Sequence, residues 1–364
     1  GFGDGTGIWD SGLSTTIKNC YVHNFDFLGS YDAPLMVRGQ NNAKVLNNTV
    51  TRGGRDALQI ISKGSEVAWN DFSHSNLIAD DCALLYTIGE THVQEISTAS
   101  VAVSEGFINS SFKLLLSPRV FLLGPSINPD TANLMNDGLR QNSLIPTTSP
   151  YGDGATCDAS VFNFTGNDAI VDWVWVELRN ASDNTNIIKS RSALVQRDGD
   201  VVDVDGVSDI EMQAAPNNYN IVVEHRNHLG AMSANTFPLR EETATVIDFT
   251  DNTFTTFGTN AQAELLSGFN ALWAGDLNAD DNIKFSGAGN DVNALKDFII
   301  ANAPLPLLTI PVSGYLNEDL DLNGEAKFSG SNNDSNLIKD IILDHPSNFL
   351  GLQTFTITVQ IPNN

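Results

Sequence analysis

GDLNADDNIKFSGAGNDVNALKDFII, residues 275–300, and EDLDLNGEAKFSGSNNDSNLIKDIIL, residues 318–343, are two copies of one pattern near the C-terminus. A shift of 43 residues superposes them and places KFSG of one on KFSG of the other. Each copy carries oxygen-bearing side chains at alternate positions and then apolar residues at helical spacing. Such a loop before a helix suits a hard cation that takes about six to eight oxygen ligands. The pattern therefore predicts two calcium (Ca²⁺) sites, each followed by a helix.

The predicted ligands stand at equivalent positions in the two copies. They are Asp276, Asn278, Asp280, Asn282 and Asp291 in the first, and Asp319, Asp321, Asn323, Glu325 and Asp334 in the second. A standard calcium loop has glycine at its sixth position and an acid at its twelfth. Here the sixth position is Asp281 or Gly324, and the twelfth is glycine in both copies. We therefore predict a lengthened loop that the next acid closes. A single such loop could be a solvated turn, but its duplication favours the metal.

The duplicated unit resembles the calcium-binding loop–helix repeats of dockerins, in a variant with KFSGxxND inserted. It resembles more closely the C-terminal module of large bacterial surface proteins exported by type IX secretion. In that family a short terminal strand follows the repeats, and this chain ends in TFTITVQIPNN, residues 354–364. The resemblance implies secretion, calcium binding and a scaffold role, and it implies no chemistry. We expect the terminal strand to pair within its own chain; pairing with a neighbouring subunit is the alternative and would build a filament.

The composition limits the classes of function. The chain has 19 basic and 44 acidic residues and a formal net charge of −25, which argues against nucleic acid and anionic membranes as partners. No apolar run approaches the roughly 20 residues of a membrane helix, so no membrane insertion is expected. Three cysteines are too few for a disulfide framework. The chain opens on GFGDGTG without a leader pattern, and we expect it to be the C-terminal part of a longer polypeptide.

Two series of short β-rich segments alternate along the first part of the chain. One series consists of 4–9, 32–37, 56–61 and 81–86, and the other of 17–22, 45–50 and 67–72. A period of about 20–30 residues with Asn recurring at one turn position is typical of a parallel β-solenoid. Asparagine tolerates left-handed backbone and can form ladders between coils. The segment resembles the right-handed parallel β-helix of pectate-lyase-like proteins, and we expect this fold over residues 1–95, as the end of a longer solenoid.

The solenoid carries a weak catalytic hypothesis. His74, Asp80 and Asp81 offer an imidazole and paired carboxylates, which are sufficient for general acid–base work on a sugar. However, Asp81 shares its repeat position with Asp32 and Asp56, as a residue that shapes every turn would do. The structural interpretation is therefore favoured.

The rest of the chain predicts further domains. A connector over 96–117 leads into a β-sandwich over 118–250, with strands expected at 169–179, 187–194 and 219–225. Trp173 and Trp175 share one face of the first strand, and core packing is favoured there over a sugar-stacking platform. The dockerin-like module is expected over 251–346, entered by an apolar helix at 261–273, and the C-terminal strand lies in 347–364. The histidines His225 and His228 lack a third ligand, so no zinc site is predicted.

Two hypotheses of different class follow. The favoured one is a secreted, calcium-binding structural or adhesive protein of the cell surface, which could assemble into filaments through solenoid ends or terminal strands. Its candidate partner is a polysaccharide or cell-surface glycan. The alternative is a glycan-active enzyme, a polysaccharide lyase or glycoside hydrolase, whose C-terminal domains serve export and anchoring. The fold class expected in both cases is mainly β: a parallel β-helix, a β-sandwich and a small α-helical calcium module with a terminal strand.

Overall fold

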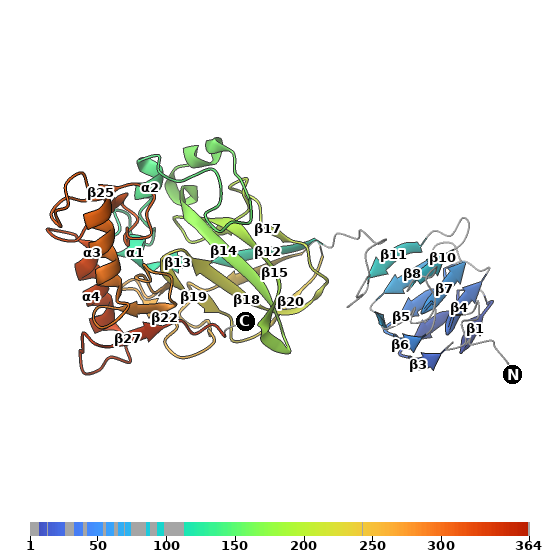
Figure 1. Ribbon diagram of the computed structural model, residues 1–364. Coiled ribbons are helices and arrows are strands. Elements are labelled where there is room, and N and C mark those ends of the chain that lie inside the picture. Colours follow the sequence, from blue (N-terminus) through green and yellow to red (C-terminus); the bar gives the residue numbers. More distant parts are fainter. Residues whose placement is uncertain are drawn as a thin grey trace. The chain divides into compact units, whose positions relative to one another are not determined.

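The computed structural model describes residues 7–12, 14–25, 33–38, 42–53, 56–61, 65–68, 70–73, 85–87, 93–97, 113–241 and 243–362. The chain divides into two compact units, Gly1–Phe112 and Lys113–Asn364. Strands are the predominant regular structure in both, so the predicted mainly β class is confirmed (Figure 1). Within the described residues, none of the helices has the length and apolar character needed to cross a membrane.

Three parallel sheets make up the described part of the first unit. The first contains β1 (Ile8–Asp10), β4 (Leu35–Arg38), β7 (Leu58–Ile61) and β10 (Leu85–Thr87). The second contains β2 (Thr16–Lys18), β5 (Lys44–Leu46), β8 (Ser65–Ala68) and β11 (Val93–Ser97), and the third β3 (Tyr21–Phe25), β6 (Thr49–Gly53) and β9 (Asp71–Ser73). The register follows the sequence repeats, since Val45 pairs with both Ile17 and Val67. Buried side chains of β2 and of β4 to β9 form one apolar cluster, and Ile8 and Val22 pack against it.

An asparagine ladder joins successive repeats of this unit. The Asn48 side chain donates to Oδ1 of Asn70 at 2.9 Å and accepts from the amide of Cys20 at 2.9 Å. Asn70 in turn donates to the carbonyl of Val45 at 2.7 Å. Both side chains are buried, so each bond replaces one that water would otherwise make. The ladder expected from the sequence is present.

The second unit is built on one large antiparallel sheet. Its strands are β16 (Val201–Val202), β15 (Asp183–Gln196), β14 (Ile170–Asn180), β18 (Asn217–His225) and β19 (His228–Met232), with β20 (Phe237–Leu239) paired to β18. Two small sheets accompany it: β17 (Ile210–Met212), β12 (Leu114–Arg119) and β21 (Ala244–Asp248), and β13 (Phe121–Leu122), β23 (Asn270–Leu272) and β22 (Gln262–Glu264). The three strands predicted here are found as β14, β15 and β18.

One helix prediction is wrong. Residues 261–273 form the β22–β23 hairpin instead of an apolar helix. Ala263 and Ala271 pair across the hairpin and are both buried, as expected of two strands with one face on the core. Gly268, with φ of 82°, makes the turn between the strands. Leu266 at the tip is fully exposed, which the helical interpretation does not anticipate.

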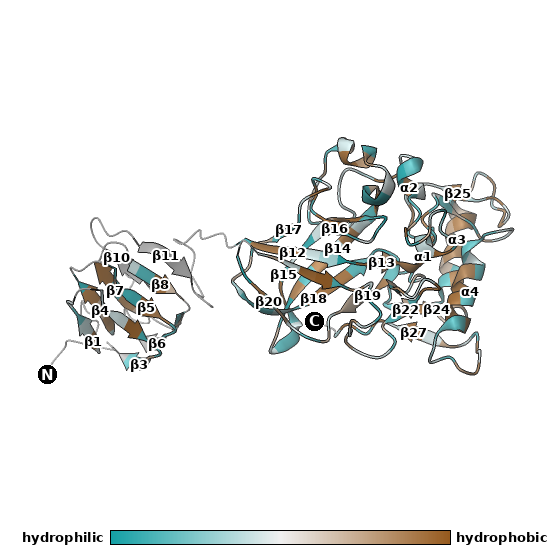
Figure 2. Cartoon of the chain, turned by 180° about the vertical axis from the view of Figure 1, so that it is seen from behind, coloured by the Kyte–Doolittle hydropathy of each residue, from teal (hydrophilic) through white to brown (hydrophobic). Residues whose placement is uncertain are grey.

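The helices of the second unit are short except for two. They are α1 (Leu123–Ser126), α2 (Gly138–Gln141), α3 (Asp291–Asn302) and α4 (Asp334–Asp344), with 3-10 helices at Ala159–Asn163 and Gly166–Asp168. The helices α3 and α4 follow the two loops as predicted and are capped by Asn290 and Asn333. Their buried residues Leu295 and Ile338 belong to the same apolar cluster as the large sheet. Figure 2 shows hydrophobic residues on the central strands and along these helices.

A short strand pair involves each loop, and the pair at the first loop attaches the end of the chain to it. The strand β24 (Asn282–Lys284) pairs with β27 (Thr356–Thr358), and β25 (Val312–Ser313) pairs with β26 (Glu325–Ala326). Beyond β27, Ile361 packs against Val222 and Met232 on the large sheet. The terminal strand therefore pairs within its own chain, as favoured from the sequence.

The asparagine ladder gives a first prediction. Replacing Asn70→Ala leaves buried amide and carbonyl groups of two repeats unpaired, and we expect the first unit to lose about 2–4 kcal/mol of stability. Urea unfolding followed by hydrogen-exchange mass spectrometry of peptides from residues 42–73 measures this. Asn19→Gly, at an exposed left-handed position, is the control and should change little. Equal losses in the two variants would contradict the ladder's role.

The half-buried acid Glu224 of the large sheet gives a pH-dependent prediction. Burial, followed by the repulsion of Glu177, raises the pKa of Glu224 from 4.5 to about 7. The folded state keeps a proton that the unfolded chain has lost, so stability falls as pH rises from about 4.5 to 7. Glu224→Gln should remove this loss and gain up to about 3 kcal/mol on wild type between pH 4.5 and 8. Exposed Glu241→Gln is the control, and parallel stability–pH curves would contradict the assignment.

Candidate metal centre

Three carboxylates converge in the second loop. Asp319, Asp321 and Asp334 each place an oxygen within 4.8 Å of the other two. Asp319 and Asp334 are buried and Asp321 is half-buried. Among the described residues, no lysine or arginine forms an ion pair with any of them. Negative charges this close repel one another strongly in a partly dry site, so the oxygen-only donor set fits a hard cation.

Backbone amides fix the two buried carboxylates of this loop. Asp319 accepts from the amides of Asn323 at 3.1 Å and Gly324 at 2.8 Å, which curls the start of the loop. Asp334, the first residue of α4, accepts from the amides of Leu320 at 2.8 Å and Lys327 at 2.7 Å. Its carboxylate thereby ties both ends of the loop to the helix.

The first loop repeats this arrangement bond for bond. Asp276 accepts from the amides of Asp280 and Asp281, each at 3.0 Å. Asp291 accepts from those of Leu277 at 2.9 Å and Lys284 at 2.7 Å. Asp281 has φ of 61°, in the same left-handed region as Gly324 at 96°, so the missing glycine does not change the turn. Asp291 and Asp334 therefore close their loops as hydrogen-bond acceptors, at the position predicted for the closing acid.

In both loops, burial and the neighbouring carboxylates disfavour the ionised form of the aspartates. Burial raises the pKa of Asp334 to about 7, with repulsion by Asp321 as the next cause. Burial likewise raises the pKa of Asp291 to about 7 and that of Asp276 to about 6. The pKa of Asp319 lies well above its usual range because the residue is buried next to Asp334 and Asp321. A bound cation would offset these costs.

The other predicted ligands of the two loops are not part of the carboxylate cluster of the second loop. Asp280 pairs with Lys284 Nζ at 2.9 Å, and Asn278 and Asn323 accept from loop amides. Asn282 accepts from the Thr358 hydroxyl at 2.8 Å, while the exposed Glu325 lies outside the cluster. These last two occupy the seventh loop position, where standard loops offer the main-chain carbonyl. A side-chain role for them is not supported.

The residues of the catalytic hypothesis, His74, Asp80 and Asp81, lie outside the described residues, so that hypothesis stays a prediction. Asp56, from the repeat position of Asp81, is buried and accepts from Gln59 Nε2 at 3.0 Å. This contact suits a residue that shapes the turn.

The tryptophan pair does not form a sugar platform. Trp173 is fully buried, and its indole N–H donates to the carbonyl of Pro146 at 2.8 Å, so core packing is confirmed for it. Trp175 is half-buried, donates to Glu177 at 3.0 Å and packs against the Tyr151 ring.

Sequence reasoning missed a buried polar network between the large sheet and the second loop. Asp172 accepts from Arg226 Nε at 3.1 Å and from the Tyr315 hydroxyl at 2.6 Å, and it contacts His225 Nε2 at 3.1 Å. His225 also contacts His228 through their Nδ1 atoms at 3.0 Å. Burial lowers the pKa of both imidazoles. The two histidines thus serve a hydrogen-bond chain. Only their spacing marked them in the sequence.

Asn227, at the turn of β18 and β19, contacts the start of both loops. Its side-chain amide donates to the carbonyl of Asp319 at 2.8 Å and to that of Asn317 at 2.9 Å. Its own carbonyl accepts from the amide of Gly275, the residue before Asp276, at 2.9 Å. The turn therefore couples the large sheet to the first ligand position of each loop.

The repulsion among Asp319, Asp321 and Asp334 gives a prediction for the stability of the protein at pH 8 in the presence of a chelator. Asp321→Asn keeps the side-chain shape and removes one charge, so we expect it to raise the free energy of unfolding by about 1 kcal/mol. Urea unfolding measures this, and Asp297→Asn on the exposed face of α3 is the control. A loss of stability would mean that the protein itself neutralises Asp321.

The chain was compared with protein-family models, with curated proteins and with solved structures, and no match was found in any of the three. The resemblances to dockerins, to type IX-exported surface proteins and to pectate-lyase-like β-helices therefore stay hypotheses that rest on their residues.

Proposed function

We propose that this chain is a calcium-binding structural or adhesive protein of the cell surface, with one Ca²⁺ site in each loop. The observation that carries the proposal is the convergence of Asp319, Asp321 and Asp334, with which no described lysine or arginine forms an ion pair. Burial and the two neighbouring carboxylates raise the pKa of Asp319 and outweigh the charge of Arg226, which lowers it. Carboxylates and carbonyls are the ligands that Ca²⁺ prefers, whereas zinc and copper sites favour His and Cys. Neither residue type takes part in the cluster.

Asp319, Asp321 and Asp334 would hold the ion in the second loop, with the Asn323 side chain and the Glu325 carbonyl as further oxygens. Asp276, Asn278, Asp280 and Asp291 and the Asn282 carbonyl take the same places in the first. A bound ion supplies positive charge that joins the start of each loop to the helix that follows. The residues themselves do the rest: they orient backbone amides and hold the helix N-terminus against the core.

A structural role is favoured because both loops are built into the core of the second unit. Asn227 contacts the loop starts, and Leu295 and Ile338 of the helices lie in the same apolar cluster as the large sheet. Ion binding would thus stabilise the unit as a whole.

We also propose a parallel β-helix for the first unit, a dockerin-like module for the duplicated loops, and secretion to the cell surface. The repeated parallel register of the first unit supports turns of a right-handed parallel β-helix. The duplicated loops with their terminal strand support a dockerin-like module of the kind found in type IX-exported proteins. Secretion, surface attachment and a glycan partner follow from that resemblance and are proposed with it, as is self-association through solenoid ends.

Calcium titration tests the proposal. Isothermal calorimetry should find two sites, and free Ca²⁺ at a hundred times Kd should stabilise the protein by about 2.7 kcal/mol per site. Asp334→Asn should remove one site, Asp291→Asn the other, and the double variant both. Asp340→Asn, exposed on the outer face of α4, is the matched control. A melting temperature that does not change between chelator and millimolar Ca²⁺ would refute the two-site proposal.

A further inference from the structure

A groove with an apolar floor opens beside α4 in the second unit. Its volume is about 1000 Å³, and its floor and walls include Leu123, Ile127, Leu134, Leu265, Leu337 and Ile341. Leu266, fully exposed on the tip of the β22–β23 hairpin, stands at its edge. A volume of this order accommodates several side chains.

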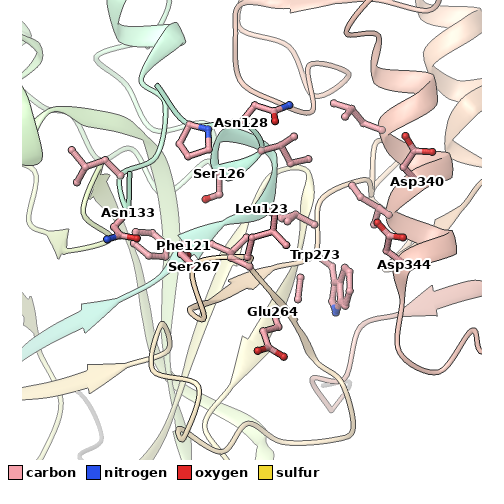
Figure 3. Close-up of a pocket in the computed structure, with 18 of the residues that line it drawn as sticks. Phe121, Leu123, Ser126, Asn128, Asn133, Glu264, Ser267, Trp273, Asp340 and Asp344 are labelled. Atoms are coloured by element: carbon pink, nitrogen blue, oxygen red, sulfur yellow. The ribbon is translucent and has the colours of Figure 1, made fainter. Parts of the chain in front are cut away.

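Carboxylates mark the rim of the groove. Figure 3 shows Asp340 and Asp344 on α4 at one side and Glu264 on the hairpin below. All three are exposed. The described lining residues include no lysine, arginine or histidine. Asp340 also pairs with Lys339 Nζ at 3.4 Å, so Asp344 and Glu264 are the rim carboxylates that form no ion pair with a described lysine or arginine. An apolar floor under a mainly acidic rim is complementary to an apolar segment that carries positive charge.

Both walls of the groove are fixed by the second loop. The α4 wall begins at Asp334, whose carboxylate closes that loop. The opposite wall contains α1, where a Cβ on Gly124 would lie 1.7 Å from the carbonyl oxygen of Leu320. The loop backbone therefore lies directly against α1, and only glycine permits this approach. The width of the groove depends on the conformation of the loop.

We propose that the groove binds a peptide segment in which pairs of apolar side chains, Leu, Ile or Phe, are flanked by Lys or Arg. The apolar side chains fill the floor, and the basic groups pair with Glu264, Asp340 and Asp344. Binding is strongest when the second loop holds its cation, because the ion fixes both walls. This last dependence rests on the proposed calcium function, whereas the groove and its charge do not.

Fluorescence anisotropy with labelled model peptides tests the proposal on the full chain. The probes are GKLLKLLKG, its acidic counterpart GELLELLEG and its neutral counterpart GSLLSLLSG, each in Ca²⁺ and in chelator. We expect the basic peptide to bind at least about tenfold more tightly than either of the others, and more tightly in Ca²⁺ than in chelator. Equal binding of all three peptides, or binding of none, would overturn the proposal.

Charge reversal locates the site. Asp340→Lys should weaken binding of the basic peptide about tenfold and strengthen binding of the acidic one. Asp297→Lys is the matched control, since Asp297 holds the repeat position of Asp340 on α3, has the same neighbouring-lysine pair and lies outside the groove. Equal effects of the two changes would show binding by general charge and refute the groove.

Two further results separate the alternatives. Sedimentation velocity that shows a dimer dissolved by the α4 charge reversal would give the groove to a second copy of the chain and overturn the peptide proposal. Calcium binding in calorimetry without any peptide binding would refute the peptide proposal and leave the calcium proposal standing. If the peptide binds equally well in Ca²⁺ and in chelator, and calorimetry detects no heat of calcium binding, the calcium proposal is refuted and the peptide proposal stands.

Discussion

The carboxylate of Asp334 is the constraint on which the second unit depends. It accepts from amides at the beginning and the end of its loop and is also the first residue of α4. Few groups serve a loop and a helix N-terminus at once, and a carboxylate suits both because it accepts several hydrogen bonds and favours the positive end of the helix. The cost is a buried negative charge beside two others. The same carboxylate therefore sets the loop geometry and the helix position, and it carries the negative charge that the proposed cation would offset.

The two loops share this chemistry but hold different neighbours. The first pairs through β24 with the terminal strand, from which Ile361 reaches the large sheet and the Pro362 carbonyl accepts from Arg179. The second lies against α1 and receives the Asn227 side chain. Each copy thus ties a different part of the chain to the same sheet. The two loops therefore share one hydrogen-bonding pattern and differ in the elements that they contact.

The sequence allowed the features with a local period to be predicted. Both loops, the helices after them and the strands β14, β15 and β18 repeat or alternate within a short window, and the repeats before residue 97 gave the parallel register. Residues 261–273 misled because a short apolar run fits a hairpin as well as a helix. The network of Asp172, Arg226 and Tyr315 could not be predicted, since Tyr315 and Asp172 are 143 residues apart and meet only in the folded chain. Nothing local marks either as buried.

The remaining difference between the copies lies in their charge. The second loop places three carboxylates together, whereas the first has Asn278 where the second has Asp321, and its Asp280 is already paired with Lys284. A cation entering the first loop would have to displace that lysine. Both loops offer three aspartates among the proposed ligands, because Asp280 stands where the second loop has Asn323. In the second loop nothing has to be displaced among the described residues, and Asn227 already holds its first ligand position. The free carboxylates and the preorganisation of the second loop therefore favour it as the stronger of the two proposed sites. The helices α1 and α4 also lie directly against this loop, so more of the structure depends on the site that we expect to be stronger.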